Sequence, residues 1–281
     1  MQNQIIDTIQ VKKVEPSVRL SDFLVGKSVH LPSGKSIKKA LKKGLVLKNG
    51  EVAFSGDYVK ENDIIQIVKE DIPVKKVFPL ELEVVFEDEF IAVVNKPAGY
   101  PVSGNYFKTI ENALPRNLKP SQEKDALAYP RCIHRLDNPT TGLLIVAKTK
   151  ASRVFLGQEL EKGNIAKSYL CVTQGKMAQA GLLQMPIDCK TAITKFKVLK
   201  SVPSLRSGQL NSVSCKIETG RTHQIRKHFD KFGHPVMGDP KYGRGNKNED
   251  GMKLVAYKLE LKDPISKEDH LFELPDELKL F

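Results

Sequence analysis

Strand-like runs make up most of the regular pattern in this 281-residue chain, and helical patterns interrupt them at only three places, residues 33–44, 150–163 and 223–233. The strand-like runs are short, apolar and bounded by glycine, proline and asparagine turn signals. Strict strand–helix alternation would indicate a parallel α/β fold, and the order here does not follow it. The chain is therefore predicted to be α+β, with a mixed, largely antiparallel sheet.

A proline-bearing segment divides the chain. Residues 72–80 read IPVKKVFPL, with two prolines and no periodicity, which predicts a linker over 71–80. The length suits two domains, and we place a small α/β domain at 14–70 and a larger domain at 81–281. Within the larger domain, the polar segment 104–130 is predicted to be a surface loop or insertion.

Several protein classes are excluded by composition. No apolar run reaches the roughly 18 residues that a membrane span needs, and the first residues lack the basic and apolar regions of a secretory signal. The four cysteines include no CxxC pair, which favours reduced thiols over a disulfide framework or a zinc site. We expect a cytoplasmic protein with no membrane contact, and a monomer by default.

Lysines without any acidic residue mark the small domain. Seven lysines and no acid lie between Phe23 and Gly50. Ser33 or Ser36 can cap a helix here and Gly44 can end it. At about 100° per residue, five of these lysines fall on one face. Their mutual repulsion would be relieved by a phosphate backbone, although a solvated helix face is the simpler alternative. The five candidates for RNA contact are Lys35, Lys38, Lys39, Lys42 and Lys43.

The charge of the whole chain supports a polyanionic partner. The formal net charge is +12 and the sequence pI is near 9.4. A basic surplus of this size is typical of proteins that bind nucleic acid, although many basic proteins bind none.

Three polar clusters lie beside strand-like runs, namely NKPAG at 95–99, HRLDNPTTG at 134–142 and TGRTHQIR at 219–226. Asp137 stands on a turn ahead of the apolar run LLIVAK, where a local Asx turn is its simplest role. Arg221 and Arg226 flank a helix start. A carboxylate held against an arginine in a cleft stays ionised, which suits a nucleophile, and a surface ion pair is the alternative.

Other chemistries fit less well. His223, His228 and His234 have no HExxH arrangement and do not share one helix face, so no metal site is predicted. The chain contains no GxGxxG, GxxxxGK[ST] or GxSxG motif, which removes support for nucleotide-dependent and α/β-hydrolase chemistry. We expect no cofactor.

The three clusters and the run KSYLCVTQG at 167–175 together carry a resemblance. HRLDNPTTGLLIVAK resembles the signature of the RluA-type pseudouridine synthases, and NKPAGYPV, KSYLCVTQG and TGRTHQIRKHFDKFGHPVMGDPKYG match that family in the same order. The small domain resembles the alpha-L RNA-binding domain through RLSDFL at 19–24, the lysine helix, GLV at 44–46 and NDII at 62–65.

The resemblance implies a pseudouridine synthase fold and an isomerase that needs neither cofactor nor metal. Asp137 would attack the target uridine at its ring or at the ribose carbon, and Arg226 would pair with Asp137. Tyr169 would stack on the base and take the carbon-5 proton. A stacked base is unreachable, so it must flip out of the helix. Arg135 would help to displace it.

RNA contacts are expected from Arg135, Arg221 and His134 and from the lysine helix. The substrate implied is structured RNA, ribosomal RNA in the first place and transfer RNA as the alternative. A non-catalytic RNA-binding or ribosome-assembly factor with the same fold is the competing hypothesis. The presence of Asp137, Tyr169 and Arg226 together argues against it, because a binding protein has no need of all three.

Overall fold

The chain divides into two compact units in a computed structural model, which describes residues 4–15, 17–69, 76–243, 245–246 and 248–275. The small unit is Met1–Val74 and the large unit is Lys75–Phe281. Residues 71–75 of the predicted linker lie outside the described residues, and 76–80 have no regular secondary structure. No helix among the described residues is long and apolar enough to cross a membrane.

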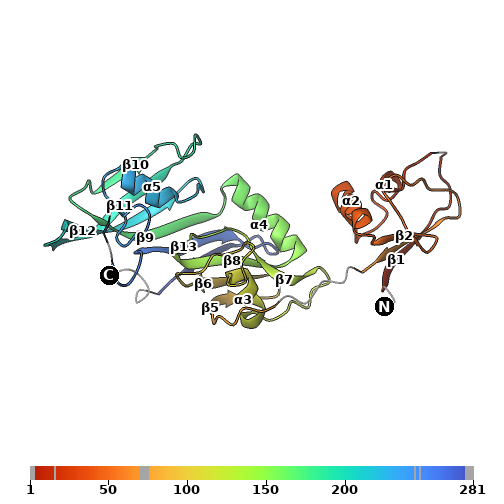
Figure 1. Cartoon of the computed structure of the whole chain (residues 1–281), viewed down its shortest axis with the longest axis horizontal. Helices are drawn as coiled ribbons and strands as arrows, with labels where there is room; N and C mark the ends of the chain where they lie inside the picture. Colours follow the sequence, from red (N-terminus) through yellow and green to blue (C-terminus); the bar gives the residue numbers. More distant parts are fainter. Residues whose placement is uncertain (1–3, 16, 70–75, 244, 247, 276–281) are drawn as a thin grey trace. The chain divides into compact units, whose positions relative to one another are not determined.

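The small unit is a four-stranded antiparallel sheet with two helices (Figure 1). Its elements are β1 (Ile5–Gln10), α1 (Leu20–Phe23), α2 (Gly34–Lys42), β2 (Val46–Lys48), β3 (Glu51–Val52) and β4 (Ile64–Val68), and the sheet order is β1-β4-β2-β3. Strand β1 precedes residue 14, so this sheet begins earlier than the predicted small domain. Asn49 and Gly50, both with positive φ, form the tight turn between β2 and β3.

The lysine helix forms as its sequence predicts. Ser33 caps α2 in a reciprocal capping box with Ser36, and Gly44 follows the helix with φ +68°. The apolar side of α2 packs into the core of the small unit. The five lysines on the other side are all exposed. This face therefore concentrates positive charge on the surface of the small unit.

The large unit is built on one ten-stranded sheet. Its strands are β5 (Glu83–Glu87), β6 (Ile91–Lys96), β7 (Ala126–Cys132), β8 (Thr141–Thr149), β9 (Ala166–Gln174), β10 (Ala180–Leu183), β11 (Thr194–Ser204), β12 (Gly208–Ile217), β13 (Leu254–Lys262) and β14 (Asp269–Glu273). The main order is β10-β11-β12-β9-β13-β8-β6-β5, with β7 beside β8 and β14 beside β13. Strands β8 and β13 run parallel and the other pairs run antiparallel. The predicted α+β class with a largely antiparallel sheet is confirmed.

Three helices cover the two faces of this sheet, α3 (Ile110–Asn117), α4 (Lys150–Lys162) and α5 (Gln224–Lys231). Leu144 of β8 belongs to the same core cluster as Phe229 of α5. The next residue, Ile145, belongs to the cluster that contains Leu156 of α4. Because alternate strand residues point to opposite faces, α4 and α5 lie on opposite sides of the sheet. We call the side that carries α5 the α5 face.

Gly142 allows β8 to lie against β13. Its φ is +112°, and a Cβ built there would lie 2.3 Å from the carbonyl oxygen of Ala256. A side chain at this position would collide with backbone, which cannot move aside as a flexible side chain could. The close approach of the two parallel strands therefore requires glycine at the last position of the HRLDNPTTG cluster.

The prediction of a loop over 104–130 is wrong. Helix α3 lies inside this segment, and β7 begins within it. Ile110, Ala113 and Leu114 are fully buried at helical spacing, and Thr109 caps the helix through Asn112 N–H. Pro115 suggested a break, but it stands in a helix of only eight residues, where it removes a single backbone donor.

Candidate active site

Asp137 lies on a turn immediately before β8, on the α5 face. Thr140 N–H closes the turn by donating to the Asp137 carbonyl at 3.0 Å, and Gly99 N–H donates to the Asn138 carbonyl at 2.9 Å. The carboxylate itself is 17% exposed. The turn is therefore fixed by backbone hydrogen bonds while its carboxylate remains reachable.

One arginine joins this carboxylate to a second one. Arg226 of α5 donates from Nη1 to Asp137 Oδ2 at 3.0 Å. The same guanidinium donates from Nε and Nη2 to Asp239, at 2.7 and 2.9 Å. Burial alone would lower the pKa of Arg226, but its hydrogen bonds to Asp239 and Asp137 raise it. The arginine therefore stays charged between the two carboxylates.

Asp239 is the inner partner, and its side chain is 0% exposed. Burial alone would raise the pKa of Asp239. Hydrogen bonds from Arg226 and from the N–H groups of Tyr242 and Lys241 lower it instead. Asp239 is thus a fully satisfied structural anion, and Asp137 is the member of the pair that a substrate can meet.

A histidine faces the other oxygen of Asp137. His223 Nε2 lies 3.8 Å from Asp137 Oδ1, and His223 Nδ1 lies 2.9 Å from the Tyr242 hydroxyl. His223 adopts a left-handed conformation, φ +57°, at the N-cap of α5. Burial is the largest cause that lowers the pKa of His223, with Asp137 opposing it. A neutral imidazole beside a carboxylate favours the proton on Nε2, so Nδ1 accepts from Tyr242.

Tyr169 stands on the same face of the sheet, in the middle of β9. It is 7% exposed and belongs to the core cluster that contains residues of α5. Burial and the nearby charge of Asp137 both raise its pKa above the ordinary value. The three residues predicted to carry the chemistry, Asp137, Tyr169 and Arg226, therefore come together from a turn, a strand and a helix.

Lys96 was not among the predicted site residues, although its motif was noted. It ends β6, is 0% exposed, and donates to the carbonyls of Pro97, Asn138 and Thr140 at 2.9, 3.1 and 2.7 Å. Burial lowers its pKa to about 8, and the charge of Asp137 opposes that effect. The signal was a lysine at a strand end followed by proline, which periodicity alone does not distinguish from a surface lysine.

The predicted RNA-contact residues of the large unit differ in their surroundings. Arg135 is exposed, and Arg221 donates from Nε to the Thr191 carbonyl at 2.9 Å. His134 points inward, where its Nε2 accepts from Ile145 N–H at 3.3 Å, and burial lowers its pKa to about 3. An RNA contact through His134 stays a prediction, and its ring nitrogens face the protein interior.

The histidines considered as metal ligands each contact protein groups. His228 lies 3.0 Å from Thr194 Oγ1 and 2.9 Å from the Met185 carbonyl. His234 Nδ1 lies 3.0 Å from the Gln174 carbonyl. Across the described ranges, no group of three or more His, Cys, Asp or Glu side chains is placed to hold a metal ion.

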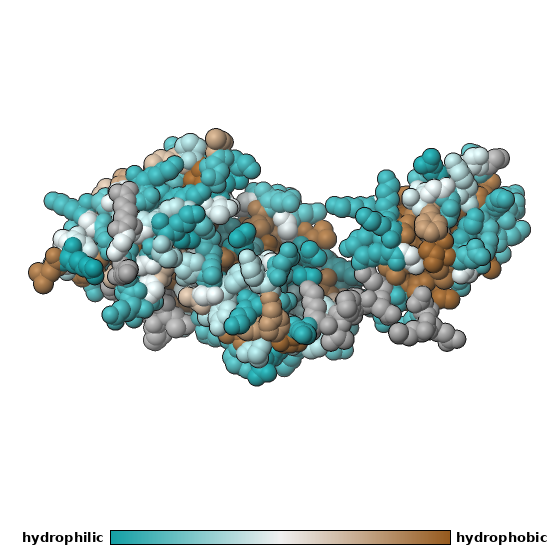
Figure 2. All heavy atoms as spheres, viewed as in Figure 1, coloured by the Kyte–Doolittle hydropathy of each residue, from teal (hydrophilic) through white to brown (hydrophobic). Residues whose placement is uncertain are grey.

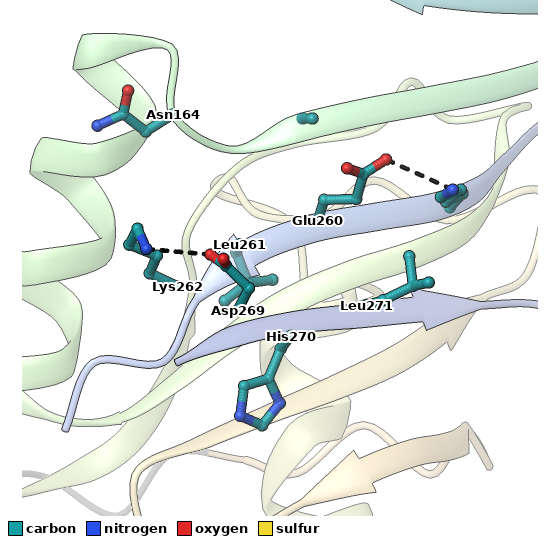
Figure 3. A pocket seen from close by; sticks show the side chains of 9 residues that line it. Asn164, Glu260, Leu261, Lys262, Asp269, His270 and Leu271 are labelled. Carbon is teal, nitrogen blue, oxygen red and sulfur yellow. Dashed lines mark ion pairs between the residues drawn. The ribbon is translucent and has the colours of Figure 1, made fainter. Parts of the chain in front are cut away.

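A separate pocket of about 380 Å³ lies between β13, β14 and the start of β9 (Figure 3). Its charged side chains pair with each other, Lys262 with Asp269 at 3.1 Å and Lys258 with Glu260 at 3.5 Å. None of the predicted site residues lines it. The Asp137 cluster, and not this pocket, therefore stays the predicted site.

Comparison with known proteins shows the family to which the chain belongs. Residues 90–231 match the family described as RNA pseudouridylate synthase. This chain belongs to the RNA pseudouridylate synthase family. The match covers about half of the chain and includes Asp137, Tyr169 and Arg226. It confirms the RluA-type family predicted from the motifs and, with it, the isomerase class.

Curated relatives from several bacteria agree. The chain is 33% identical over 227 residues to the ribosomal large subunit pseudouridine synthase D of Nitrosomonas europaea, covering 71% of this chain and 64% of that protein. It is 32% identical to an uncharacterized RNA pseudouridine synthase of Bacillus subtilis, covering 81% of this chain and 80% of the relative. An uncharacterized RNA pseudouridine synthase of Aquifex aeolicus is 31% identical, with coverage of 97% and 95%.

A solved structure has the same fold. Human RNA pseudouridylate synthase domain containing 1 superposes with a TM-score of 0.56 at 26% identity, covering 69% of this chain and 83% of the human chain. The predicted pseudouridine synthase fold is confirmed by this likeness.

Proposed function

We propose that this chain converts uridine to pseudouridine in ribosomal RNA, with Asp137 as the nucleophile. Family membership and the names of its curated relatives support the reaction and the RNA class. The observation that carries the proposal is the asymmetry of the two carboxylates on Arg226. Asp239 is completely buried, whereas Asp137 is 17% exposed and lies on the face of the sheet that carries Tyr169.

The reaction needs a flipped nucleotide. Extruding a base from a helix costs a few kcal/mol, and stacking on an aromatic ring returns about 1–3 kcal/mol. The Asp137 carboxylate attacks the uridine at its ring or at the ribose carbon. The glycosidic bond breaks with its electron pair going to N1, the uracil rotates, and carbon 5 bonds to the ribose carbon. The bond to Asp137 then breaks and returns the carboxylate, either as carbon 5 displaces it from the ribose carbon or by elimination from the ring. The carbon-5 proton passes to solvent, and N1 takes up a proton. Nothing is oxidised or reduced, and no atom is gained or lost apart from exchanged protons.

Tyr169 is assigned to the base, and Arg226 to the nucleophile. The Tyr169 phenol is protonated at neutral pH with an ordinary tyrosine pKa of about 10, and burial raises its pKa further. This favours stacking and hydrogen bonding over accepting the carbon-5 proton. Arg226 fixes one oxygen of Asp137, which leaves the other oxygen for attack.

The small unit is proposed to be the alpha-L type RNA-binding domain. Its basic face is formed by four exposed lysines of α2 and by Lys43 directly after the helix, and Lys35 and Lys38 also line a hollow beside α1. Basic side chains on phosphates add salt-dependent affinity without reading sequence. The visible surface of the large unit is mostly hydrophilic (Figure 2), which suits a polar partner.

Tritium release tests the proposal. Ribosomal RNA transcripts labelled at carbon 5 of uridine should release tritium with the wild-type protein. Asp137→Asn should lower the rate by at least about 10³-fold. Asp250→Asn, which changes an exposed carboxylate paired with Lys253, should leave the rate unchanged. Release that survives Asp137→Asn would overturn the mechanism.

Mapping of pseudouridines in cells with and without the gene tests the substrate. Loss of a modification in ribosomal RNA is the expected outcome. If pseudouridine is lost only from transfer RNA, then transfer RNA and not ribosomal RNA is the substrate. Normal RNA binding with no change at any uridine would favour a non-catalytic assembly factor.

A further inference from the structure

Lys167 is a cation of the site that the chemistry above does not use. It lies two residues before Tyr169 on β9, so the two side chains point to the same face of the sheet. Its cross-strand neighbour Ile217 packs on the core cluster that includes Tyr169. The ammonium group lies 4.0 Å from the position that a Cβ on Gly220 would occupy.

The Lys167 ammonium lies near two loops of the site, the loop that contains Asp137 and the loop that contains Gly220. Gly220 belongs to the loop that leads into His223 and Arg226. On the other side, the positive charge of Lys167 acts on His134, which stands three residues before Asp137, and contributes to its lowered pKa. Lys167 therefore lies between the nucleophile loop and the loop before α5.

The ammonium of Lys167 has no hydrogen-bond or ion-pair partner within the described parts of the chain. This contrasts with Lys96, which donates to three carbonyls. Lys167 is only partly exposed, and burial lowers its pKa. Burying an ammonium group without a hydrogen-bond or ion-pair partner costs free energy, so the position of Lys167 does not stabilise the fold. An anionic ligand would supply that partner.

Resting on the proposed function, we propose that Lys167 binds a backbone phosphate of the RNA beside the flipped nucleotide. Lys167 and Tyr169 are about 6.6 Å apart along the strand, a spacing that suits the base and the phosphate of one nucleotide. With the base on Tyr169, a phosphate of the same strand can reach the ammonium. Lys167 is thus a positioning residue, which sets where the ribose stands relative to Asp137.

The charge of the cluster agrees with this role. Asp137 and Asp239 are both engaged by Arg226, so neither is available to neutralise Lys167. Arg221 adds a further cation on the loop beside Gly220. A surplus of positive charge next to the nucleophile favours an anion over the neutral uracil ring.

Lys167→Met tests the proposal, since it removes the charge and keeps the length. With labelled ribosomal RNA transcripts, KM should rise about tenfold at moderate salt while kcat changes by less than about threefold. The slope of log affinity against log salt, measured by binding of the same transcripts, should fall by about 0.7–0.9. Lys167→Arg should restore most of both. Lys197→Met is the matched control, a strand lysine exposed on the opposite face of the sheet, and should change neither.

An RNA with one uncharged phosphate substitute tests whether Lys167 contacts that phosphate. The RNA is a short one that carries the mapped uridine with a methylphosphonate beside it. This substitution should lower the RNA affinity of the wild-type protein as much as Lys167→Met lowers it on unmodified RNA, and it should lower the affinity of Lys167→Met no further. If the two losses of affinity add, Lys167 does not contact that phosphate and is assigned to the base instead.

The two proposals fail in different ways. A wild-type protein that releases no tritium refutes the proposed function, and the salt slope of binding still decides the phosphate contact. An active wild-type protein whose KM and salt slope are unchanged by Lys167→Met refutes the role of Lys167 alone. If Lys167→Met unfolds, Lys167→Arg and the methylphosphonate RNA decide the question with folded protein.

Discussion

Asp239 holds Arg226 through two hydrogen bonds, at 2.7 and 2.9 Å, and so leaves Nη1 as the group that reaches Asp137. Asp239→Ala would remove the fixed partner of a buried cation. We expect the free energy of unfolding to fall by about 3–5 kcal/mol. The rate of tritium release should fall as well, because Arg226 is no longer held in the orientation that reaches Asp137. Thermal unfolding and release assays at a temperature where the variant is folded measure the two effects.

Asp188→Asn serves as the control for that change, because asparagine tolerates the left-handed conformation of this residue, φ +49°. Asp188 is exposed and pairs with Lys227 on the surface. Surface ion pairs contribute about 0–1 kcal/mol, so this variant should keep both stability and activity. Equal losses in the two variants would contradict the role of Asp239.

Lys96 predicts a pH dependence. Its pKa is lowered by burial to about 8, below its ordinary value, so the unfolded chain binds more protons between about pH 8 and 10.5. This group therefore makes stability rise with pH across that window, by an amount on the order of 3 kcal/mol in total. Lys96→Met should remove that part of the slope, measured by urea unfolding at a series of pH values.

Activity should respond to Lys96 in the opposite sense. Deprotonation above about pH 8 removes a donor from the carbonyls of the Asp137 turn. The rate of tritium release should therefore decline there in the wild type. If the rate of Lys96→Met declines with the same midpoint pH, another group causes the decline.

Tyr242 should act through His223. Tyr242→Phe removes the hydroxyl that orients the imidazole and keeps the ring beside Arg226. We expect a loss of up to about tenfold in kcat with KM unchanged, since the effect is on the orientation of the imidazole beside Asp137. Tyr106→Phe, which changes a tyrosine that is 71% exposed, is the comparison for a simple loss of a hydroxyl. A rise in KM alone would indicate a contact with RNA instead.

The lysine face of α2 should determine part of the salt dependence. Changing Lys35, Lys38, Lys39 and Lys42 to Gln should lower the slope of log affinity against log salt by about 0.7–0.9 for each phosphate that the helix no longer neutralises. Catalysis at low salt should remain. The matched control changes four exposed lysines of the small unit outside α2, Lys12, Lys13, Lys60 and Lys69. An equal effect of the control would show that charge, and not the helix face, is what matters.

Local signals were sufficient for the elements that the sequence predicted well. Helix α2 has its cap at Ser33 and its stop at Gly44, and α4 ends at Gly163 in the left-handed conformation that glycine favours. In these cases the residues that decide the structure are neighbours in the chain.

The parts that the sequence did not predict depend on distant residues. Helix α3 was missed because Pro115 outweighed an apolar spacing that is decisive only once the helix packs on the sheet. Strand β1 was missed because its partner β4 lies more than 50 residues away. The role of Lys96 depends on carbonyls more than 40 residues later, which no local pattern displays.

Gly142 makes the location of the chemistry a property of the framework. Strands β8 and β13 pair at Thr141–Val255 and at Gly142–Ala256, and at Gly142 a side chain would collide with backbone. Asp137 lies five positions before Gly142. Rim loops can therefore diverge, and preference among RNA sites can change, while the position of Asp137 stays fixed by the spacing of these strands. New specificity in such a scaffold is therefore to be sought at its periphery.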